Sequence, residues 1–153
     1  MARPLLVIAV GRLGQGPEAQ LCRQYAQRIV PAPELVEIDD RGRAGGATAV
    51  AWQADQILGK LTPTTYVWAL DECGPPLASA DFAQQIGAMR DQGRPLAFVI
   101  GGADGLDQRV RQRANKLLAF GRATWPHKLV RAMLLEQLYR ANMILAGHPY
   151  HRA

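Results

Sequence analysis

The sequence has only two cysteines and no long apolar run. Cys22 and Cys73 lie far apart and form no CxxC or Cys/His spacing, so we expect unpaired thiols and neither a disulfide nor a metal site. No stretch approaches the roughly 18 uncharged apolar residues that cross a bilayer, and the first apolar run is too short for a signal peptide. We therefore expect a cytoplasmic protein with no membrane partner.

Lysine is also scarce. Only three of the 18 basic residues are lysines, and arginine supplies the rest. The formal net charge of +5 favours an anionic partner, and the planar guanidinium group suits phosphates and base edges. Biased codon usage explains an arginine excess equally well, so charge alone does not establish nucleic-acid binding.

Two nucleotide-binding fingerprints are missing. The sequence has no Gly-Lys-Ser/Thr ending of a phosphate loop, and "GRLGQG" after the first apolar run lacks the GxGxxG spacing. This argues against a P-loop enzyme and against a dinucleotide-dependent oxidoreductase. The chain also lacks internal repeats and low-complexity segments, which argues against a solenoid or a disordered binder.

Short apolar runs alternate with segments of helical periodicity along the whole chain. Strands are predicted at residues 4–10, 35–39, 65–72, 95–102 and 117–120, and helices at 17–30, 48–60, 79–92, 106–115 and from His127 to about Gly147. Ser79 is the predicted N-cap of the third helix. This alternation predicts an α/β fold in one domain over residues 1–153, with a mostly parallel sheet and helices on both faces.

Apolar spacing also predicts which helix faces are buried. The first helix repeats apolar residues at Leu21, Tyr25 and Ile29, and the last helix carries a stripe of Leu134, Leu138, Ala141 and Leu145. Glu136 lies four residues before Arg140, a spacing that favours an ion pair on that helix.

Candidate binding segments follow the predicted strands. In open parallel sheets, ligands bind beyond the carboxyl ends of the strands, which here places residues 70–73, 101–105 and 120–125 at one edge. The stretch "GGADG" within these segments can turn sharply and approach a flat ligand, although such a stretch alone is usually a plain turn. Arg109 and Arg113 share a helical face that either is solvated or tracks phosphates, and His127 is expected to be structural.

The sequence ends in "HPYHR", where Pro149 restricts both neighbouring residues. Tyr150 can stack on a base, His148 or His151 can move a proton near neutral pH, and Arg152 can bind phosphate. The other interpretation is a solvated polar terminus.

Three of these stretches are specific in combination: "FVIGGADGL", "TWPHKLVRAMLLEQLYRA" and the terminal "HPYHR". Together they resemble the large-subunit ribosomal RNA pseudouridine N3 methyltransferases of the SPOUT superfamily, over essentially the whole chain. Trp125 stands where that family usually has a smaller apolar residue or Phe.

The resemblance implies a parallel α/β domain with a C-terminal trefoil knot and S-adenosylmethionine as the methyl donor. The cofactor would be bound by Leu70, Gly101, Gly102, Phe120, Gly121, Arg122, Ala123, Thr124, Trp125 and Pro126. It also implies a homodimer in which the C-terminal tail of one subunit completes the cofactor site of the other.

The implied substrate is a pseudouridine of large-subunit rRNA in assembled ribosomes. On this reading Tyr150 positions the target base, and His151 assists proton removal, with His148 and Tyr150 as alternative bases. RNA contacts would come from Arg109, Arg113, Arg140 and Arg152.

Two other functions stay open at this point. One is a non-catalytic RNA-binding protein that kept the fold, which predicts RNA affinity without cofactor binding. The other is a methyltransferase that acts on tRNA, as other SPOUT proteins do.

Overall fold

A parallel sheet forms the centre of the molecule. The computed structural model describes residues 3–42 and 45–151. The strands are β1 (Leu6–Val10), β2 (Glu34–Ile38), β3 (Tyr66–Leu70), β4 (Leu96–Ile100) and β5 (Lys116–Leu118). They are ordered β2-β1-β4-β3-β5, and every neighbouring pair is parallel. This confirms the predicted α/β class and parallel sheet.

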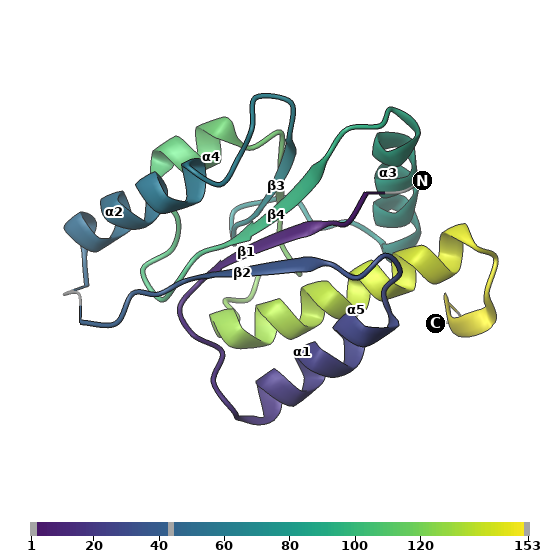
Figure 1. The fold of residues 1–153 in the computed structure, drawn as a ribbon, viewed down its shortest axis with the longest axis horizontal. Coiled ribbons are helices and arrows are strands. Elements are labelled where there is room, and N and C mark those ends of the chain that lie inside the picture. Colours follow the sequence, from purple (N-terminus) through teal and green to yellow (C-terminus); the bar gives the residue numbers. More distant parts are fainter. Residues whose placement is uncertain (1–2, 43–44, 152–153) are drawn as a thin grey trace.

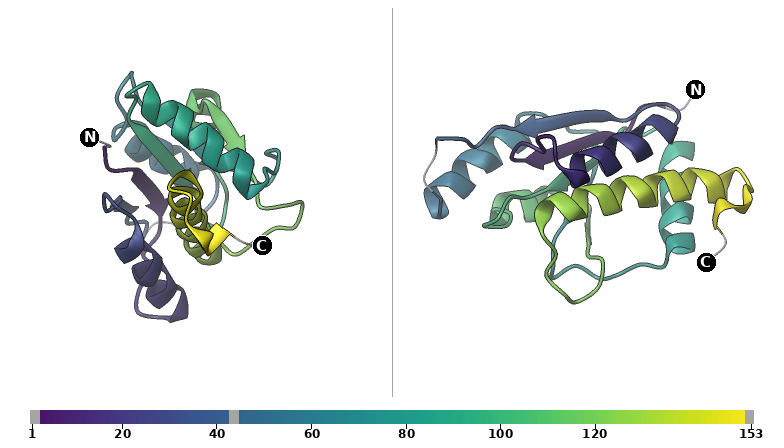
Figure 2. Two further views of the ribbon diagram at one scale, coloured as in Figure 1. Left: turned by 90° about the vertical axis from the view of Figure 1, so that its right-hand side faces the viewer. Right: turned by 90° about the horizontal axis from the view of Figure 1, so that it is seen from below.

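Helices cover both faces of the sheet (Figures 1 and 2). The helices α1 (Pro17–Arg28), α3 (Ser79–Asp91) and α5 (His127–Leu145) lie on one face, and α2 (Ala47–Leu58) and α4 (Gln108–Arg113) lie on the other. A short 3-10 helix, η1 (Pro149–His151), follows α5. Because βαβ connections place helices on both faces, the inner strands read as continuous apolar runs.

Each face of the sheet has its own apolar core. Trp68 and Phe98 pack against Phe82 of α3, with ring centroids 5.3 and 6.0 Å from that of Phe82. Val67 and Val99, one residue along each strand, point into the opposite core under α2 and α4. All five residues of β4 are buried, so this strand has helices on both sides along its whole length.

Arg131 fixes the beginning of α5 over the ends of β1 and β2. Its guanidinium group is buried and donates to Glu37 Oε2 at 2.5 Å and to the Gly11 carbonyl at 3.2 Å. Glu37 also accepts from the Leu13 backbone N–H at 2.7 Å. This charged pair positions α5 relative to the carboxyl edge of the sheet.

The predicted cap of α3 is wrong. Ser79 is the first residue of the helix, Ala78 is the N-cap, and among the described residues no side chain caps this end. The Ser79 hydroxyl instead donates to Gln137 Oε1 of α5 at 2.8 Å. A tertiary hydrogen bond between the two helices has replaced the local one.

Two residues of the predicted apolar stripes are not buried. Leu21 is 39% exposed, and α1 buries Ala19 and Cys22 instead. In α5, Leu134, Leu138 and Ala141 are buried as expected, whereas Leu145 is 45% exposed. The last turn of α5 extends beyond the sheet (Figure 1), so less of the protein covers Leu145.

The predicted ion pair within α5 is confirmed, with Arg140 Nη2 lying 2.6 Å from Glu136 Oε1. Within residues 3–42 and 45–151, no helix has the length and apolar character needed to cross a membrane. The trefoil knot stays a prediction.

Candidate active site

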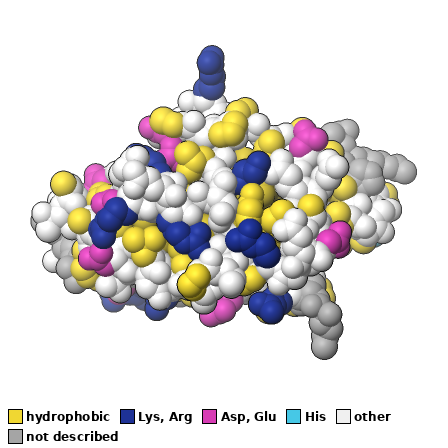
Figure 3. Space-filling model, turned by 90° about the horizontal axis from the view of Figure 1, so that it is seen from above, with side chains coloured by type: hydrophobic (Ala, Val, Ile, Leu, Met, Phe, Trp, Pro, Cys, Tyr) yellow, Lys and Arg dark blue, Asp and Glu magenta, His cyan; other side chains and the backbone are white. Residues whose placement is uncertain are grey.

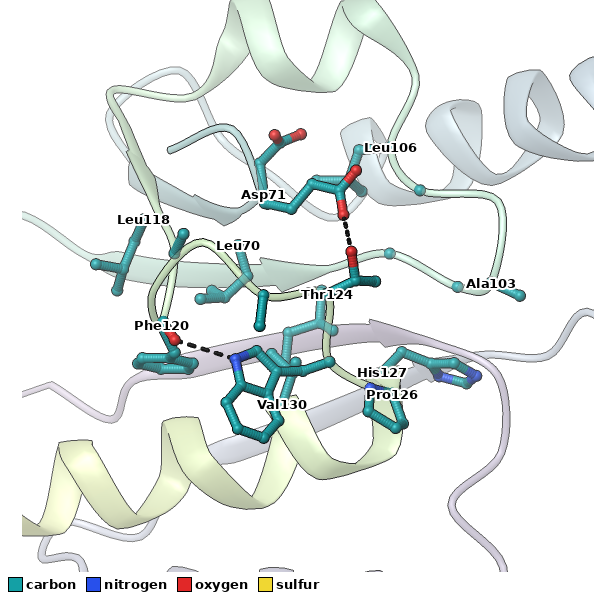
Figure 4. Close-up of a pocket in the computed structure, with 18 of the residues that line it drawn as sticks. Leu70, Asp71, Ala103, Leu106, Leu118, Phe120, Thr124, Pro126, His127 and Val130 are labelled. Carbon is teal, nitrogen blue, oxygen red and sulfur yellow. Dashed lines mark hydrogen bonds between the residues drawn. The ribbon is translucent and has the colours of Figure 1, made fainter. Parts of the chain in front are cut away.

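A cavity of about 740 Å³ lies at the carboxyl edge of the sheet. Its walls are the turns that follow β3, β4 and β5, together with the first residues of α5 (Figure 4). Leu70, Ile100, Leu118 and Phe120 supply much of its apolar surface. A cavity of this size, with apolar walls and a few polar groups, suits a small organic ligand.

The turn after β4 is built from glycine because its backbone folds closely onto itself. Gly102 and Gly105 form an isolated antiparallel bridge, and the Gly105 N–H donates to the Gly102 carbonyl at 3.1 Å. A Cβ on Gly101 would lie 2.9 Å from the backbone of Gly105, and one on Gly102 would lie 3.1 Å from Val10. The "GGADG" stretch is therefore a tight turn with backbone facing the cavity.

Residues 119–126 form a loop that closes another side of the cavity. Trp125 Nε1 donates to the Phe120 carbonyl at 3.0 Å, which joins the two ends of this loop (Figure 4). The Thr124 hydroxyl donates to Glu72 Oε2 at 2.8 Å, which ties the loop to the turn after β3. Gly121 has φ +98°, a conformation that favours glycine.

Acidic groups predominate among the charged residues of the cavity. Asp71, Glu72 and Asp104 line it, and Asp104 Oδ2 accepts from the Gly46 N–H at 3.2 Å. The Asp71 side chain is only 4% exposed and lies 2.6 Å from Arg111 Nε. Since Arg111 neutralises only one of these carboxylates, the cavity is suited to a ligand that carries a positive charge.

His127 lines the cavity where α5 begins. Burial lowers its pKa, and the nearby positive charges of Arg131 and Lys128 lower it further. Its Nδ1 atom is buried and has no hydrogen-bond partner within the described chain. The imidazole is therefore neutral at pH 7.

Tyr150 packs against α5 of its own chain. Its ring lies edge-on to Tyr139, with centroids 4.6 Å apart, and the Arg140 guanidinium lies 5.1 Å from its centroid. Its hydroxyl donates to Glu136 Oε1 at 3.3 Å. Burial raises the pKa of Tyr150, and the Glu136 charge raises it further. The Tyr150 N–H also donates to His148 Nδ1 at 3.2 Å.

The tail and the cavity lie at opposite ends of α5. The cavity is at the first residues of this 19-residue helix, and a rise of 1.5 Å per residue places its last residue about 27 Å away. The tail follows that far end, in yellow in Figure 1. Within one chain, the structure therefore does not bring His148 or Tyr150 to the cavity.

Comparison with known proteins decides the family. The family model described as "Predicted SPOUT methyltransferase" matches residues 4–151. The chain belongs to the SPOUT methyltransferases. This confirms the resemblance drawn from the three sequence stretches.

Relatives of this SPOUT chain cover nearly its full length. It is 50% identical to "Ribosomal RNA large subunit methyltransferase H" of Paramagnetospirillum magneticum, over 97% of this chain and 98% of the relative. It is 51% identical to the protein of the same name from Rhodospirillum centenum, over 97% and 99% of the two chains.

A solved structure shares the SPOUT fold. It is the SpoU methyltransferase AviRb from Streptomyces viridochromogenes in complex with the cofactor AdoMet. The TM-score is 0.52 at 13% sequence identity, and the match covers 94% of this chain and 59% of that chain. At this identity the likeness shows the fold alone.

The predicted cofactor residues of this SPOUT chain converge on one cavity. All of them except Arg122 line it, and Arg122 lies exposed on the same loop. Three further polar residues line the cavity from the predicted binding segments 70–73 and 101–105, namely Asp71, Glu72 and Asp104, although the sequence does not single them out. Arg111 and His127 also line it, but they lie in helices outside those segments, where the sequence pattern gives no signal for the site.

The predicted RNA-binding arginines are in several places. Arg140 lies near the tail, and Arg152 and the His151 side chain lie outside the described part of the structure. Arg109 and Arg113 lie in α4, on the face of the sheet opposite α5. Figure 3 shows the molecule from above the view of Figure 1, with Lys and Arg side chains lying among hydrophobic and uncharged ones. Arg109 and Arg113 both bind oxygen atoms of their own chain, and their contact with RNA stays a prediction.

Proposed function

We propose that this protein transfers a methyl group from S-adenosylmethionine to N3 of a pseudouridine in large-subunit rRNA, acting on assembled ribosomes in the cytoplasm. The observation that carries the proposal is the cavity at the carboxyl edge, formed by the turns of a SPOUT methyltransferase. The names of the relatives support rRNA of the large subunit as the substrate.

The residues of the cavity fit this cofactor. The backbone at Gly101 leaves no room for a side chain, and that at Gly102 leaves little. Both residues offer N–H and C=O groups to the edge of an adenine. Leu70, Leu118 and Phe120 provide apolar surface for its ring faces. Glu72 and Asp104 provide negative charge suited to a sulfonium. When bound, the cofactor supplies an electrophilic methyl group.

The protein must orient the acceptor base and accept the proton that leaves N3. A uracil-type N3 is only weakly acidic, so methylation requires a nearby base or surroundings that stabilise the anion. We assign positioning of the base to Tyr150 and proton removal to His151, with His148 and Tyr150 as alternatives. Arg140 and Arg152 would hold RNA phosphate or the base anion.

A homodimer reconciles this assignment with the separation of tail and cavity. Since about 27 Å of helix separates them within one chain, the tail can serve a cavity only if that cavity belongs to a second copy. In a two-fold symmetric dimer each tail reaches the other chain, so both sites are completed together. Such a dimer would give Tyr150 and His151 a place beside a cavity, although both follow the far end of α5.

Ribosomes from cells that lack the gene provide the test. The purified protein with labelled S-adenosylmethionine should restore one methyl group on a pseudouridine of large-subunit rRNA, located by mass analysis of RNA fragments. Ribosomes that lack pseudouridine are the matched control. Label in tRNA instead would contradict the rRNA assignment, and RNA binding without saturable cofactor binding would favour the non-catalytic alternative.

The tail assignment is tested separately. His151→Ala should lower turnover markedly while cofactor affinity persists. His148→Ala and Tyr150→Phe, measured in parallel, should identify which group removes the proton. Unchanged turnover in His151→Ala would remove this residue from the mechanism.

A further inference from the structure

We propose that Arg111 binds an anionic oxygen group of a ligand in the cavity. The inference rests on the proposed function and assigns a role to a residue outside the sequence motifs. Arg111 lies in the last turn of α4 and lines the cavity beside the turn after β4. Its side chain is 39% exposed and forms part of the cavity wall, so a ligand in the cavity can contact it.

The other arginines of α4 have different surroundings. Arg109 donates from Nη1 to Asp55 Oδ1 at 2.8 Å and from Nη2 to the Ala51 carbonyl at 2.9 Å. Arg113 donates from Nη2 to the carbonyls of Thr62 and Thr65, both at 2.9 Å. Neither residue lines the cavity. Both guanidinium groups serve to join α4 to neighbouring segments.

Within the described part of the chain, the Arg111 guanidinium group is held through Nε alone. Nε donates to Asp71 Oδ2 at 2.6 Å, and Asp71 Oδ1 accepts from the Cys73 N–H at 2.9 Å. No partner for Nη1 or Nη2 is found among residues 3–42 and 45–151. Because the Asp71 carboxylate is buried and held on both oxygens, it anchors the Arg111 guanidinium group at Nε. The N–H groups on Nη1 and Nη2 therefore remain available to donate to a planar oxyanion of a ligand.

Arg111 is the charged group of the described cavity wall that attracts an anion. Of the lining residues within the described chain, Arg111 alone is an arginine or lysine. An oxyanion that enters the cavity meets Glu72 and Asp104, which repel it, and Arg111, which attracts it. Two ligand groups share the required chemistry: the carboxylate at the amino-acid end of the cofactor, and a phosphate beside the target nucleotide.

Binding and kinetics of Arg111→Ala distinguish the two sources. The ligands are S-adenosylhomocysteine, 5′-methylthioadenosine, which lacks the carboxylate, and undermethylated ribosomes. If the carboxylate is bound, the dissociation constant for S-adenosylhomocysteine rises about 10-fold or more, and that for methylthioadenosine does not change. If a phosphate is bound, both dissociation constants stay constant and KM for ribosomes rises by a similar factor. Either result supports the proposal.

Controls separate this role from a structural one. Arg109→Ala removes a neighbouring guanidinium from the same helix and should leave the dissociation constants for S-adenosylhomocysteine and methylthioadenosine near the wild-type values. KM for ribosomes is not compared in this variant, because Arg109 is itself a predicted RNA contact. Because Arg111→Ala leaves Asp71 buried without its counter-ion, the double variant Asp71→Asn/Arg111→Gln is measured as well. Arg111→Lys keeps the positive charge but loses the planar guanidinium group, so it should bind more tightly than Arg111→Ala and less tightly than wild type.

The inference is overturned if both Arg111→Ala and the double variant fold and keep all three constants within twofold of wild type. It is also overturned if methylthioadenosine and S-adenosylhomocysteine weaken equally, since the cavity would then be distorted as a whole. A wild-type protein that binds neither S-adenosylhomocysteine nor ribosomes would contradict the proposed function itself.

Discussion

Gly101 has no space for even one methyl group. Its added Cβ would lie 2.9 Å from the carbonyl of Gly105, which is backbone and cannot rotate away. We expect Gly101→Ala to cost about 1–3 kcal/mol of unfolding free energy, as overpacking does, and to weaken cofactor binding. Denaturant unfolding and calorimetric titration with S-adenosylhomocysteine measure the two effects.

Gly87→Ala is the matched control for this prediction. A Cβ on Gly87 would lie 2.9 Å from Leu145 Cδ2, the tip of a half-exposed side chain that can move. Alanine within α3 should gain up to about 1 kcal/mol in helix propensity. A Gly101→Ala protein as stable and as active as Gly87→Ala would contradict the close approach described for the turn.

His127 makes stability depend on pH. Its pKa in the folded protein is below the ordinary value of 6.5, mainly through burial, so the unfolded chain takes up a proton first as the pH falls. The neutral imidazole therefore makes its full contribution to the free energy of unfolding above pH 6.5, and this contribution decreases as the pH falls below that value. Melting temperatures between about pH 5 and 7.5 should fall less steeply in His127→Gln than in wild type. If the melting temperatures of the two proteins change in parallel with pH, burial does not lower the pKa of His127.

At the scale of elements, α4 depends on one capping side chain. Asp107 is its N-cap, and the carboxylate accepts from the Arg109 backbone N–H at 2.8 Å. Asp107→Ala should cost about 1 kcal/mol, whereas Asp107→Asn should keep most of the cap. Since α4 has six residues and carries Arg111, faster amide exchange in α4 should accompany the loss. Equal stability of the two variants would contradict the capping role.

The elements themselves were largely predictable because each strand and helix carries its own local pattern. All five strands and five helices occur close to the predicted bounds. The errors concern residues whose surroundings come from distant parts of the chain. Ser79 binds Gln137 of α5, and Leu145 lies where α5 extends beyond the sheet. The local sequence pattern predicts neither the hydrogen bond between Ser79 and Gln137 nor the exposure of Leu145.

For the candidate site, the sequence likewise predicts the segments that form the cavity but not every residue that lines it. The glycine turn and the loop before α5 follow strands, so their meeting at one edge follows from a parallel sheet. The four-residue spacing on α4 points to Arg109 and Arg113 and gives no signal for Arg111. Helical spacing identifies residues that share a face, but only the fold identifies which face borders the cavity.

At the scale of the whole molecule, the distance between tail and cavity requires a second chain in the proposed mechanism. The decisive variants are Gly101→Ala, which damages the cavity, and a chain that ends at Gly147, which lacks the tail. Each homodimer should be inactive. A heterodimer with one chain of each kind, purified through two different tags, contains one intact cavity facing one intact tail, so it should have about half the wild-type activity per dimer.

The arrangement of defects provides the control. If each tail served its own chain, this heterodimer would hold one chain without a working cavity and one without a tail, and no site would be complete. A second heterodimer, with both defects in one chain and a wild-type partner, separates the two cases. It has no complete site if tails act on the partner, because the intact cavity faces the missing tail, and one complete site if they act within a chain. Activity in the second heterodimer and none in the first would contradict the exchange of tails between subunits.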